Sequence, residues 1–292
     1  MPDDAAAVSR DAAEADAAFS HPAVTPDATA AYGEHPDQVV DFYEPRIVTE
    51  TPAPLVVILH GGAWRAPYDR QHLTPFADFL ARRGFAVANV EYRRGSSIPV
   101  QGGGPAAGRW PETFDDVAAA FDALPALVAE VLPSADVRRI VVTGHSAGGH
   151  LALWVASRHV LPTGSPWRTG RPPAFRGVVA LAPIADFRAA RELGVCSDAP
   201  LQLLGGEAKF DERLPHADPA ALLPTGIATT VVQGRTDIVV PQAVAEAYAD
   251  AAAKAGEVVG VTLLEEVGHF PLIDPAADAC AVVAEEIAQL AF

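Results

Sequence analysis

The residue that is most clearly placed to do chemistry is Ser146, at the centre of the pentapeptide GHSAG at residues 144–148. An apolar run at residues 140–142 precedes it, and a run that suits a helix, residues 151–156, follows it. A strand, a tight turn and a helix in this order hold a serine hydroxyl above a sheet edge, and the glycines leave room for the strained turn. The pattern predicts a nucleophilic serine, with the Ala147 N–H and the helix N-terminus favouring negative charge beside it.

A second glycine-rich sequence, HGGAW at residues 60–64, directly follows an apolar run at residues 55–59. Glycines in such a loop let backbone N–H groups approach a ligand closely, and we expect this loop to supply the second half of an oxyanion hole. The candidate donors in the loop are Gly61, Gly62 and Ala63. The alternative is an ordinary glycine-rich turn. His60 is predicted to order the loop through a hydrogen bond rather than to act as a base.

The remaining candidates have the chain order of a catalytic triad. Asp237 comes just after the apolar run at residues 229–233, and His269 follows the last run of this kind. His269 would take the proton of Ser146, while Asp237 would fix the imidazole tautomer and stabilise the imidazolium. Asp186, which follows the preceding apolar run, is the alternative acid.

Side chains near these motifs are candidates for the substrate pocket. They are Trp64, Trp110, His145 and Phe270. An aromatic side chain lies more often in a core than in a pocket, so a position in the core is the alternative for both tryptophans. No group of His, Cys, Asp and Glu has the spacing of metal ligands, and the glycine run at residues 102–104 lacks the flanking residues of a phosphate loop. We therefore expect no metal and no cofactor.

The elements that must position these residues alternate along the chain. Short apolar runs are separated by longer stretches that suit helices, which indicates right-handed crossovers in a mostly parallel sheet with helices on both faces. The predicted strands lie at residues 55–59, 85–90, 140–143, 178–181, 229–233 and 258–264. The predicted helices lie near residues 71–83, 111–131, 147–159, 240–254 and 275–291.

This pattern predicts a single catalytic domain over residues 31–292. Residues 1–30 are rich in Ala and in acidic residues, which is typical of a flexible, solvated arm or a loosely docked helix. The alternative is an arm that covers the active site or a partner. Two stretches break the alternation, residues 93–110 and residues 185–226. Both are predicted to form the rim of the pocket, the second as a small cap.

Composition excludes several classes of function. Half of the 292 residues are hydrophobic, enough for a large core, and the net charge is −16. So acidic a chain is a poor match for nucleic acid or for an anionic membrane. No apolar run is long enough to span a membrane, the first residues lack a leader pattern, and Cys196 and Cys280 form no disulfide framework. We expect a cytoplasmic protein that binds a small molecule, either as a monomer or as a homodimer.

With three motifs in this order, the chain resembles the α/β-hydrolase superfamily over residues 38–292. The resemblance implies an α/β-hydrolase fold, with a mostly parallel sheet of about eight strands and a small cap. The HGGxW form of the oxyanion loop is similar to that of the kynurenine formamidase branch, whose members hydrolyse N-formyl-L-kynurenine to kynurenine and formate. Segments that also fit this branch are residues 32–36, 41–45, 204–206, 237–241 and 269–275.

This resemblance implies a serine hydrolase that cleaves a small acyl amide or ester through an acyl-enzyme intermediate. N-formylkynurenine is the first candidate substrate. Because HGGxW also occurs in esterases of the hormone-sensitive-lipase and feruloyl or acetyl esterase types, a broad carboxylesterase is the alternative. A non-catalytic scaffold of the same fold is a third hypothesis, which the presence of all three candidate triad residues disfavours. The fold alone does not separate the first two, because substrate choice depends on the pocket walls.

Overall fold

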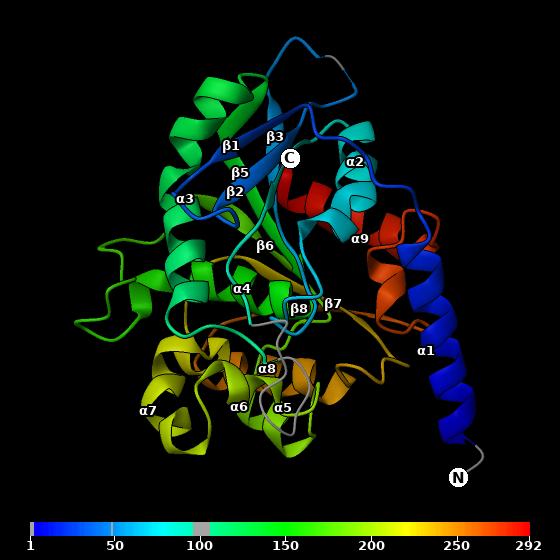
Figure 1. The fold of residues 1–292 in the computed structure, drawn as a ribbon, viewed down its shortest axis with the longest axis vertical. Helices are drawn as coiled ribbons and strands as arrows, with labels where there is room; N and C mark the ends of the chain where they lie inside the picture. The colour runs from blue at the N-terminus through cyan, green and yellow to red at the C-terminus, as the bar shows by residue number, and fades with distance from the viewer. Residues whose placement is uncertain (1–2, 48, 96–105) are drawn as a thin grey trace.

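A twisted, mostly parallel sheet forms the centre of the computed structural model, which describes residues 3–47, 49–95 and 106–292 (Figure 1). Within these residues, eight strands pair in the order β1-β2-β4-β3-β5-β6-β7-β8. The pairs β1–β2 and β2–β4 are antiparallel, and the other pairs are parallel. The strands are β1 Ala28–Ala31, β2 Val39–Tyr43, β3 Ala53–Leu59, β4 Ala86–Val90, β5 Ala135–His145, β6 Phe175–Leu181, β7 Thr229–Gly234 and β8 Gly260–Leu264.

Helices cover both faces of this sheet, as the alternating sequence pattern predicted. The helices α2 (Thr74–Arg82) and α9 (Asp278–Ala291) pack on one face, and α3 (Glu112–Val131), α4 (Ala147–Ala156) and α8 (Gln242–Lys254) pack on the other (Figure 1). In β3, Val57 faces the second group while Val56 faces the first, because successive strand residues point to opposite faces. A strand buried on both faces must be apolar throughout, which explains its continuous apolar sequence.

All six predicted strands and all five predicted helices are present, with ends that shift by a few residues. The sequence reading missed β1 and β2, which form the antiparallel edge of the sheet. The reason is local: β1 has the sequence ATAA, and β2 contains Asp41, so neither is a long apolar run. Alanine and aspartate are poor strand formers, and here the pairing of β2 with β4 and of β1 with β2 outweighs that preference.

The stretch at residues 185–226 forms a group of short helices at one end of the sheet (Figure 1). They are α5 Phe187–Glu192, α6 Ala199–Leu203, α7 Glu207–Ala217 and the 3-10 turn η3 Pro219–Leu222. The other 3-10 turns are η1 Arg70–Leu73, η2 Arg158–Val160 and η4 Phe270–Leu272. The helices α5, α6 and α7 and the turn η3 occupy the stretch that was predicted to form the cap, and this stretch also supplies part of the pocket rim. Of the predicted rim loop at residues 93–110, residues 96–105, with the glycine run 102–104, lie outside the described residues.

The N-terminal segment contains a helix, α1 (Asp3–Phe19), which lies along the side of the molecule beside η4 and the start of α9 (Figure 1). Polar and aromatic contacts join it to the body of the molecule. Within the described chain, no helix combines the length and the apolar character needed to cross a membrane.

Candidate active site

Ser146 occupies the sharp turn between β5 and α4. Its backbone has φ 58° and ψ −117°, a conformation that L-residues rarely adopt. The Ser146 N–H donates to the carbonyl of Leu181 at 2.8 Å, which ties the turn to the neighbouring strand β6. A Cβ atom at Gly148 would lie 2.0 Å from the Leu59 carbonyl oxygen, and one at Gly144 would lie 2.3 Å from the Gly148 carbonyl oxygen. Both glycines are therefore required by close backbone approach.

The predicted base and acid meet in the loops that follow β8 and β7. His269 Nδ1 lies 2.6 Å from Asp237 Oδ2, and both side chains are buried. The other carboxylate oxygen accepts from the backbone N–H groups of Val239 and Val240, each at 2.8 Å. A carboxylate oxygen is an acceptor, so Nδ1 of His269 carries the hydrogen, and in the neutral ring Nε2 keeps the free lone pair.

The alternative acid, Asp186, has a different position. Its carboxylate accepts from the Ala189 N–H at 2.9 Å and caps the N-terminus of α5. The structure therefore brings Asp237, and not Asp186, to the imidazole of His269.

His145, the second residue of GHSAG, joins the serine turn to the histidine loop. Its Nε2 lies 3.0 Å from the His269 carbonyl oxygen, and the two imidazole rings are 4.3 Å apart. Burial, together with the positive potential of a protonated His269, keeps the pKa of His145 well below its usual value. The neutral ring donates from Nε2 to that carbonyl. His145 thereby fixes the backbone of His269 relative to Ser146.

The HGGAW loop lies directly against this turn. A Cβ atom at Gly61 would lie 3.3 Å from the Ser146 Cβ and 2.8 Å from the His145 carbonyl oxygen, so only glycine fits there. Gly62 and Ala63 have φ values of +96° and +51°. Among the described residues, the N–H groups of Gly62 and Ala63 have no hydrogen-bond partner.

The Ala147 N–H is similarly placed, because it belongs to the first residue of α4 and has no partner within that helix. Donors from two separate elements therefore remain available close to the Ser146 hydroxyl, which is the requirement for stabilising an oxyanion.

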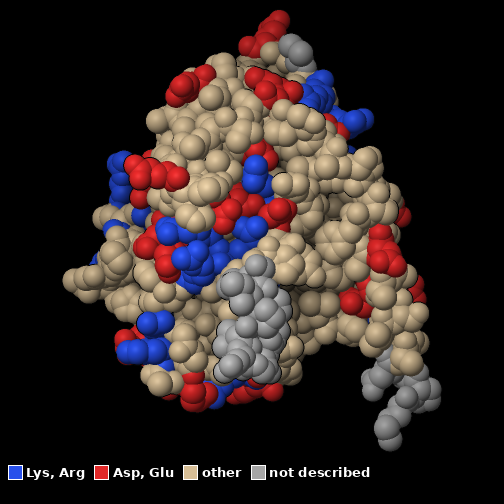
Figure 2. Space-filling model, in the orientation of Figure 1, with Lys and Arg blue, Asp and Glu red and all other residues tan. Residues whose placement is uncertain are grey.

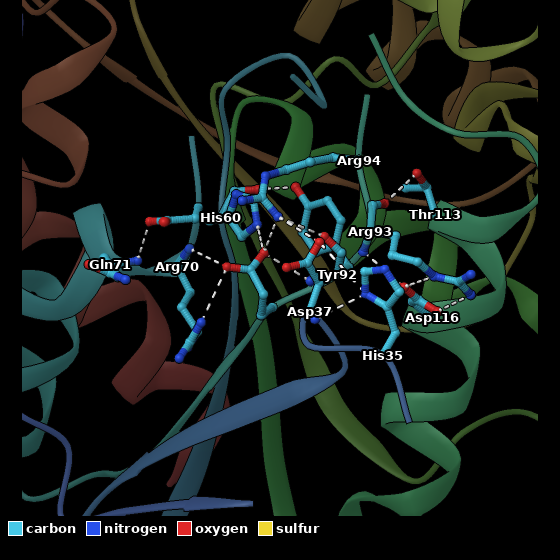
Figure 3. Close-up of polar contacts among 12 residues, drawn as sticks. His35, Asp37, His60, Arg70, Gln71, Tyr92, Arg93, Arg94, Thr113 and Asp116 are labelled. Carbon is cyan, nitrogen blue, oxygen red and sulfur yellow. Dashed lines mark hydrogen bonds and ion pairs between the residues drawn. The ribbon is translucent and has the colours of Figure 1, made fainter. Parts of the chain in front are cut away.

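A buried polar network holds the loop in place from behind (Figure 3). His60 Nε2 lies 2.8 Å from Glu91 Oε1, its Nδ1 lies 2.9 Å from the Gly61 carbonyl oxygen, and its ring stacks on Tyr92 at 4.2 Å. Although burial opposes ionisation, the charges and hydrogen bonds of His60 and Arg94 hold the pKa of Glu91 down to about 2. His60 is therefore a positioning residue of the loop, as the sequence indicated.

Arginine residues complete this network. The backbone N–H of Arg70 and Nη1 of Arg94 both donate to the Glu91 carboxylate, and Arg93 forms a two-bond ion pair with buried Asp116. Figure 2 shows that basic and acidic side chains also lie next to each other on the surface, across the middle of the face in view. These cations are paired internally, and their role here is to fix the oxyanion loop and the strand ends around it.

A cavity of about 290 Å³ opens over the serine. Of the predicted pocket residues, His145 and Phe270 line it, as do Ser146, His269, Gly62 and Ala63. The lining residues that sequence reasoning missed are Phe19, Arg65, Tyr68, His72, Cys196, Ser197 and Val239. They come from α1, the loop before α2, the cap and the acid loop. No motif marks these residues individually, although Cys196 and Ser197 belong to the stretch at residues 185–226 that was predicted to form the rim.

The two tryptophans do not line the cavity, which corrects the expectation of a stacking role for them. Trp64 is fully buried and packs edge-on against His150 and Phe187. Trp110 packs against Phe114 and Trp167. Trp64 thus packs between α4 and the cap helix α5, and the partly buried Trp110 packs against α3 and the segment after η2.

Among the described residues, no group of three or more His, Cys, Asp or Glu side chains is arranged to hold a metal ion. The two cysteines are separate free thiols, Cys196 in the lining of the pocket and Cys280 on the buried face of α9. The site therefore consists of a strained serine, a histidine paired with a carboxylate, and two sets of available backbone donors.

The parallel sheet, the turn after β5 and the loops after β7 and β8 together define an α/β-hydrolase. A family model called BD-FAE matches residues 40–251, and the chain belongs to this BD-FAE family.

Individual proteins that match this chain share only a small part of its sequence. A kynurenine formamidase of Drosophila melanogaster is 24% identical over 251 residues, which cover 84% of this chain and 75% of that protein. The non-reducing polyketide synthase ausA of Aspergillus calidoustus is 30% identical over 146 residues, 46% of this chain and only 6% of the synthase. The crystal structure of esterase B from Lactobacillus rhamnosis superposes with a TM-score of 0.73 at 18% identity, covering 99% of this chain and 96% of the esterase. These matches show the BD-FAE family and the α/β-hydrolase fold, and the named relatives include a formamidase and an esterase.

Proposed function

We propose that this chain is a serine hydrolase that cleaves a small acyl amide or ester through an acyl-enzyme intermediate. The observation that carries the proposal is the pocket itself. Ser146, on a strained turn at the N-terminus of α4, lines the same cavity as His269, and Nδ1 of His269 is bound to the buried carboxylate of Asp237.

In the first step, the Ser146 Oγ attacks the carbonyl carbon of the substrate and its proton passes to Nε2 of His269. Asp237 holds the imidazole and stabilises the imidazolium that forms. The carbonyl oxygen becomes an oxyanion, which accepts hydrogen bonds from the Ala147 N–H and from the loop N–H groups of Gly62 and Ala63.

Collapse of this intermediate breaks the bond to the leaving group. His269 gives its proton to the leaving oxygen or nitrogen, and the acyl group stays on Ser146 as an ester. A water molecule then loses a proton to His269 and attacks the acyl carbon. This releases the acid and regenerates the serine hydroxyl.

The first substrate that we propose is N-formylkynurenine. The support is the likeness to the Drosophila kynurenine formamidase, which extends over 84% of this chain, together with a pocket wall that carries several aromatic rings. The second candidate is a broad carboxylesterase, which the apolar and aromatic lining of the cavity also suits.

The test of the mechanism is labelling with a fluorophosphonate probe followed by peptide mapping. We expect the adduct on Ser146, and we expect Ser146→Ala to lose labelling and about 10⁶-fold in kcat, because triad members act as a unit. The matched control is Ser197→Ala, which removes another hydroxyl of the same cavity and should keep both. An adduct on Ser197, or an active Ser146→Ala variant, would contradict the proposal.

The test of the substrate is kcat/KM for N-formylkynurenine beside phenyl acetate and ethyl acetate. A value at least about tenfold higher for the formamide, roughly 1.4 kcal/mol in transition-state binding, supports the formamidase. Ester hydrolysis without detectable formamide cleavage would support the carboxylesterase instead.

A further inference from the structure

The helix α1 has one face against the body of the molecule. The residues on this face are spaced three or four apart, at positions 7, 11, 14 and 18, and all four are partly or fully buried. This spacing places them on one side of a helix. Ala18, near the C-terminal end of α1, is only 4% exposed, whereas Val8 on the outer side is 59% exposed. The helix is therefore docked, and its docked face meets the candidate active site.

Polar contacts fix α1 to the two loops that carry the acid and the base. Nη2 of Arg10 donates to the Thr236 carbonyl oxygen at 3.2 Å, one residue before Asp237. The Gly268 N–H donates to Oε1 of Glu14 at 3.2 Å, one residue before His269. A Cβ atom at position 268 would lie 1.9 Å from the Glu14 carboxylate, so the glycine permits this close contact.

At the end of α1, the ring of Phe19 reaches the pocket. It packs edge-on against Phe270 at 5.3 Å and against His72 at 5.6 Å, and Tyr68 lies 6.5 Å away. Phe270 in turn packs edge-on against His269 at 5.1 Å. A continuous row of rings thus leads from the candidate base to the surface of α1.

Phe19 and two residues that contact it also form a wall shared by two neighbouring cavities. The first is the cavity over Ser146, and the second, of about 320 Å³, lies between the end of α1 and the segment before α2. The residues common to both are Phe19, Tyr68 and His72. We call these three residues with Phe270 the aromatic compartment.

One of these four residues, His72, carries a buried polar atom. Nδ1 of His72 has no hydrogen-bond partner among the described residues. Burial, reinforced by the nearby His60, lowers the pKa of His72 to about 3, so its ring is neutral. An unpartnered buried nitrogen is costly unless a ligand satisfies it.

The position of the base decides which part of a substrate meets this wall. His269 must hand its proton to the leaving group, so the leaving group lies on the His269 side of the scissile bond. Phe270 adjoins His269 on that side, and Phe19 packs on Phe270. The oxyanion, by contrast, points toward the Gly62 and Ala63 N–H groups.

From this geometry we infer that α1 is part of the active site, and that Phe19 is a specificity-determining residue whose ring contacts an aromatic leaving group in the aromatic compartment. The inference rests on the serine hydrolase proposed above. A planar ring can join the edge-to-face row already formed by Phe19, His72 and Phe270, whereas a short alkyl alcohol cannot reach it.

The experiment compares Phe19→Ala with the native chain on benzyl acetate and ethyl acetate, which share one acyl group. We expect KM for benzyl acetate to rise about five- to tenfold, which corresponds to the loss of one aromatic pair, while kcat/KM for ethyl acetate stays within about twofold. The matched control is Val8→Ala, which shortens an outward-facing side chain of the same helix and should match the native chain on both esters.

A binding measurement keeps this test separate from the catalytic proposal. Benzyl alcohol, the leaving group itself, is titrated by NMR into the native, Phe19→Ala and Val8→Ala proteins, and its Kd should rise in Phe19→Ala alone. An unchanged Kd in Phe19→Ala would overturn the inference whether or not the chain hydrolyses esters. An equal loss of activity on both esters, with weaker fluorophosphonate labelling of Ser146, would also overturn it, since α1 would then act only through the fold. Failure of the native protein to label at Ser146 would instead count against the serine hydrolase.

Discussion

The carboxyl-terminal edge of the sheet, where the parallel strands end, and the walls of the pocket are built in different ways. At the edge, Ser146, Asp237 and His269 each follow a parallel strand, and backbone hydrogen bonds fix every turn that carries them. The walls come from α1 and from the cap, which reach the site from distant parts of the chain. They are joined to it by side chains, such as the Glu14 contact with the Gly268 N–H.

This difference explains why the two regions should respond differently to mutation. Strand ends in a doubly covered sheet are rigid, so the reacting groups keep their geometry. Helices and loops that pack over the edge can change their side chains without disturbing the sheet, which lets one fold serve many substrates. Substitutions at the edge should therefore abolish chemistry, while those in the walls should alter substrate choice or stability.

The largest effect on catalysis is expected for Asp237, the carboxylate that contacts His269. Asp237→Asn should leave the fold intact but destabilise the productive His269 tautomer, and kcat should fall about 10⁴-fold. The matched control is Asp186→Asn, which also removes a loop carboxylate that accepts a backbone N–H but lies away from His269. Steady-state kinetics on phenyl acetate measures both. A crippled Asp186→Asn with a mild Asp237→Asn would reverse the assignment.

A smaller loss is expected for the oxyanion loop. A Cβ atom at Gly62 would lie 2.2 Å from the Tyr68 side chain, so Gly62→Ala should shift the donors and lower kcat about 10²–10³-fold. Gly164→Ala is the matched control, because Gly164 has a similar φ of +94° and no atom within 4 Å of the added carbon. Both variants carry the backbone strain, and only Gly62→Ala should lose activity. Equal activity in the two variants would show that the loop N–H groups do not bind the oxyanion.

Substitutions in the walls should change the free energy of unfolding, and the clearest case is Asp218 under the cap. Its buried carboxylate accepts from the N–H groups of Phe187 and Ala220. Burial, with a further contribution from Asp186, raises the pKa of Asp218 to about 7. Because the folded pKa lies above the unfolded one, the protonated group stabilises the fold at low pH, and this contribution is lost as the pH rises from about 4 to about 7.

Asp218→Asn cannot ionise, so its free energy of unfolding should not show this loss. Relative to the native chain, we expect the variant to gain roughly 2–4 kcal/mol in unfolding free energy between pH 4 and pH 8, since each pKa unit is worth about 1.4 kcal/mol. Urea unfolding at the two pH values measures it. Asp211→Asn on α7, with an exposed side chain, is the control. Parallel pH profiles for native and Asp218→Asn chains would mean that the cap carboxylate stays ionised throughout.

Local sequence was sufficient to predict which residues lie at the carboxyl-terminal edge of the sheet. The positions of Ser146, Asp237 and His269 follow from apolar runs that end in turn residues, because the carboxyl ends of parallel strands meet at one edge. Gly61 and Gly148 could also be placed, since their tight contacts are with backbone. The antiparallel strands β1 and β2 were missed because their short, partly polar sequences become strands only through pairing, β2 with β4 and β1 with β2.

The walls of the pocket were decided by the tertiary structure. The sequence marks Trp64 and Phe19 alike as large apolar side chains, yet Trp64 is fully buried in the core and Phe19 lines the cavity. Burial depends on which surfaces α1 and the cap find when they pack, and that information is spread over residues far apart in the chain. The chain's sequence therefore determined the sheet and the order of its reacting groups, whereas packing determined which side chains surround them, because periodicity encodes a residue's face but not its partner.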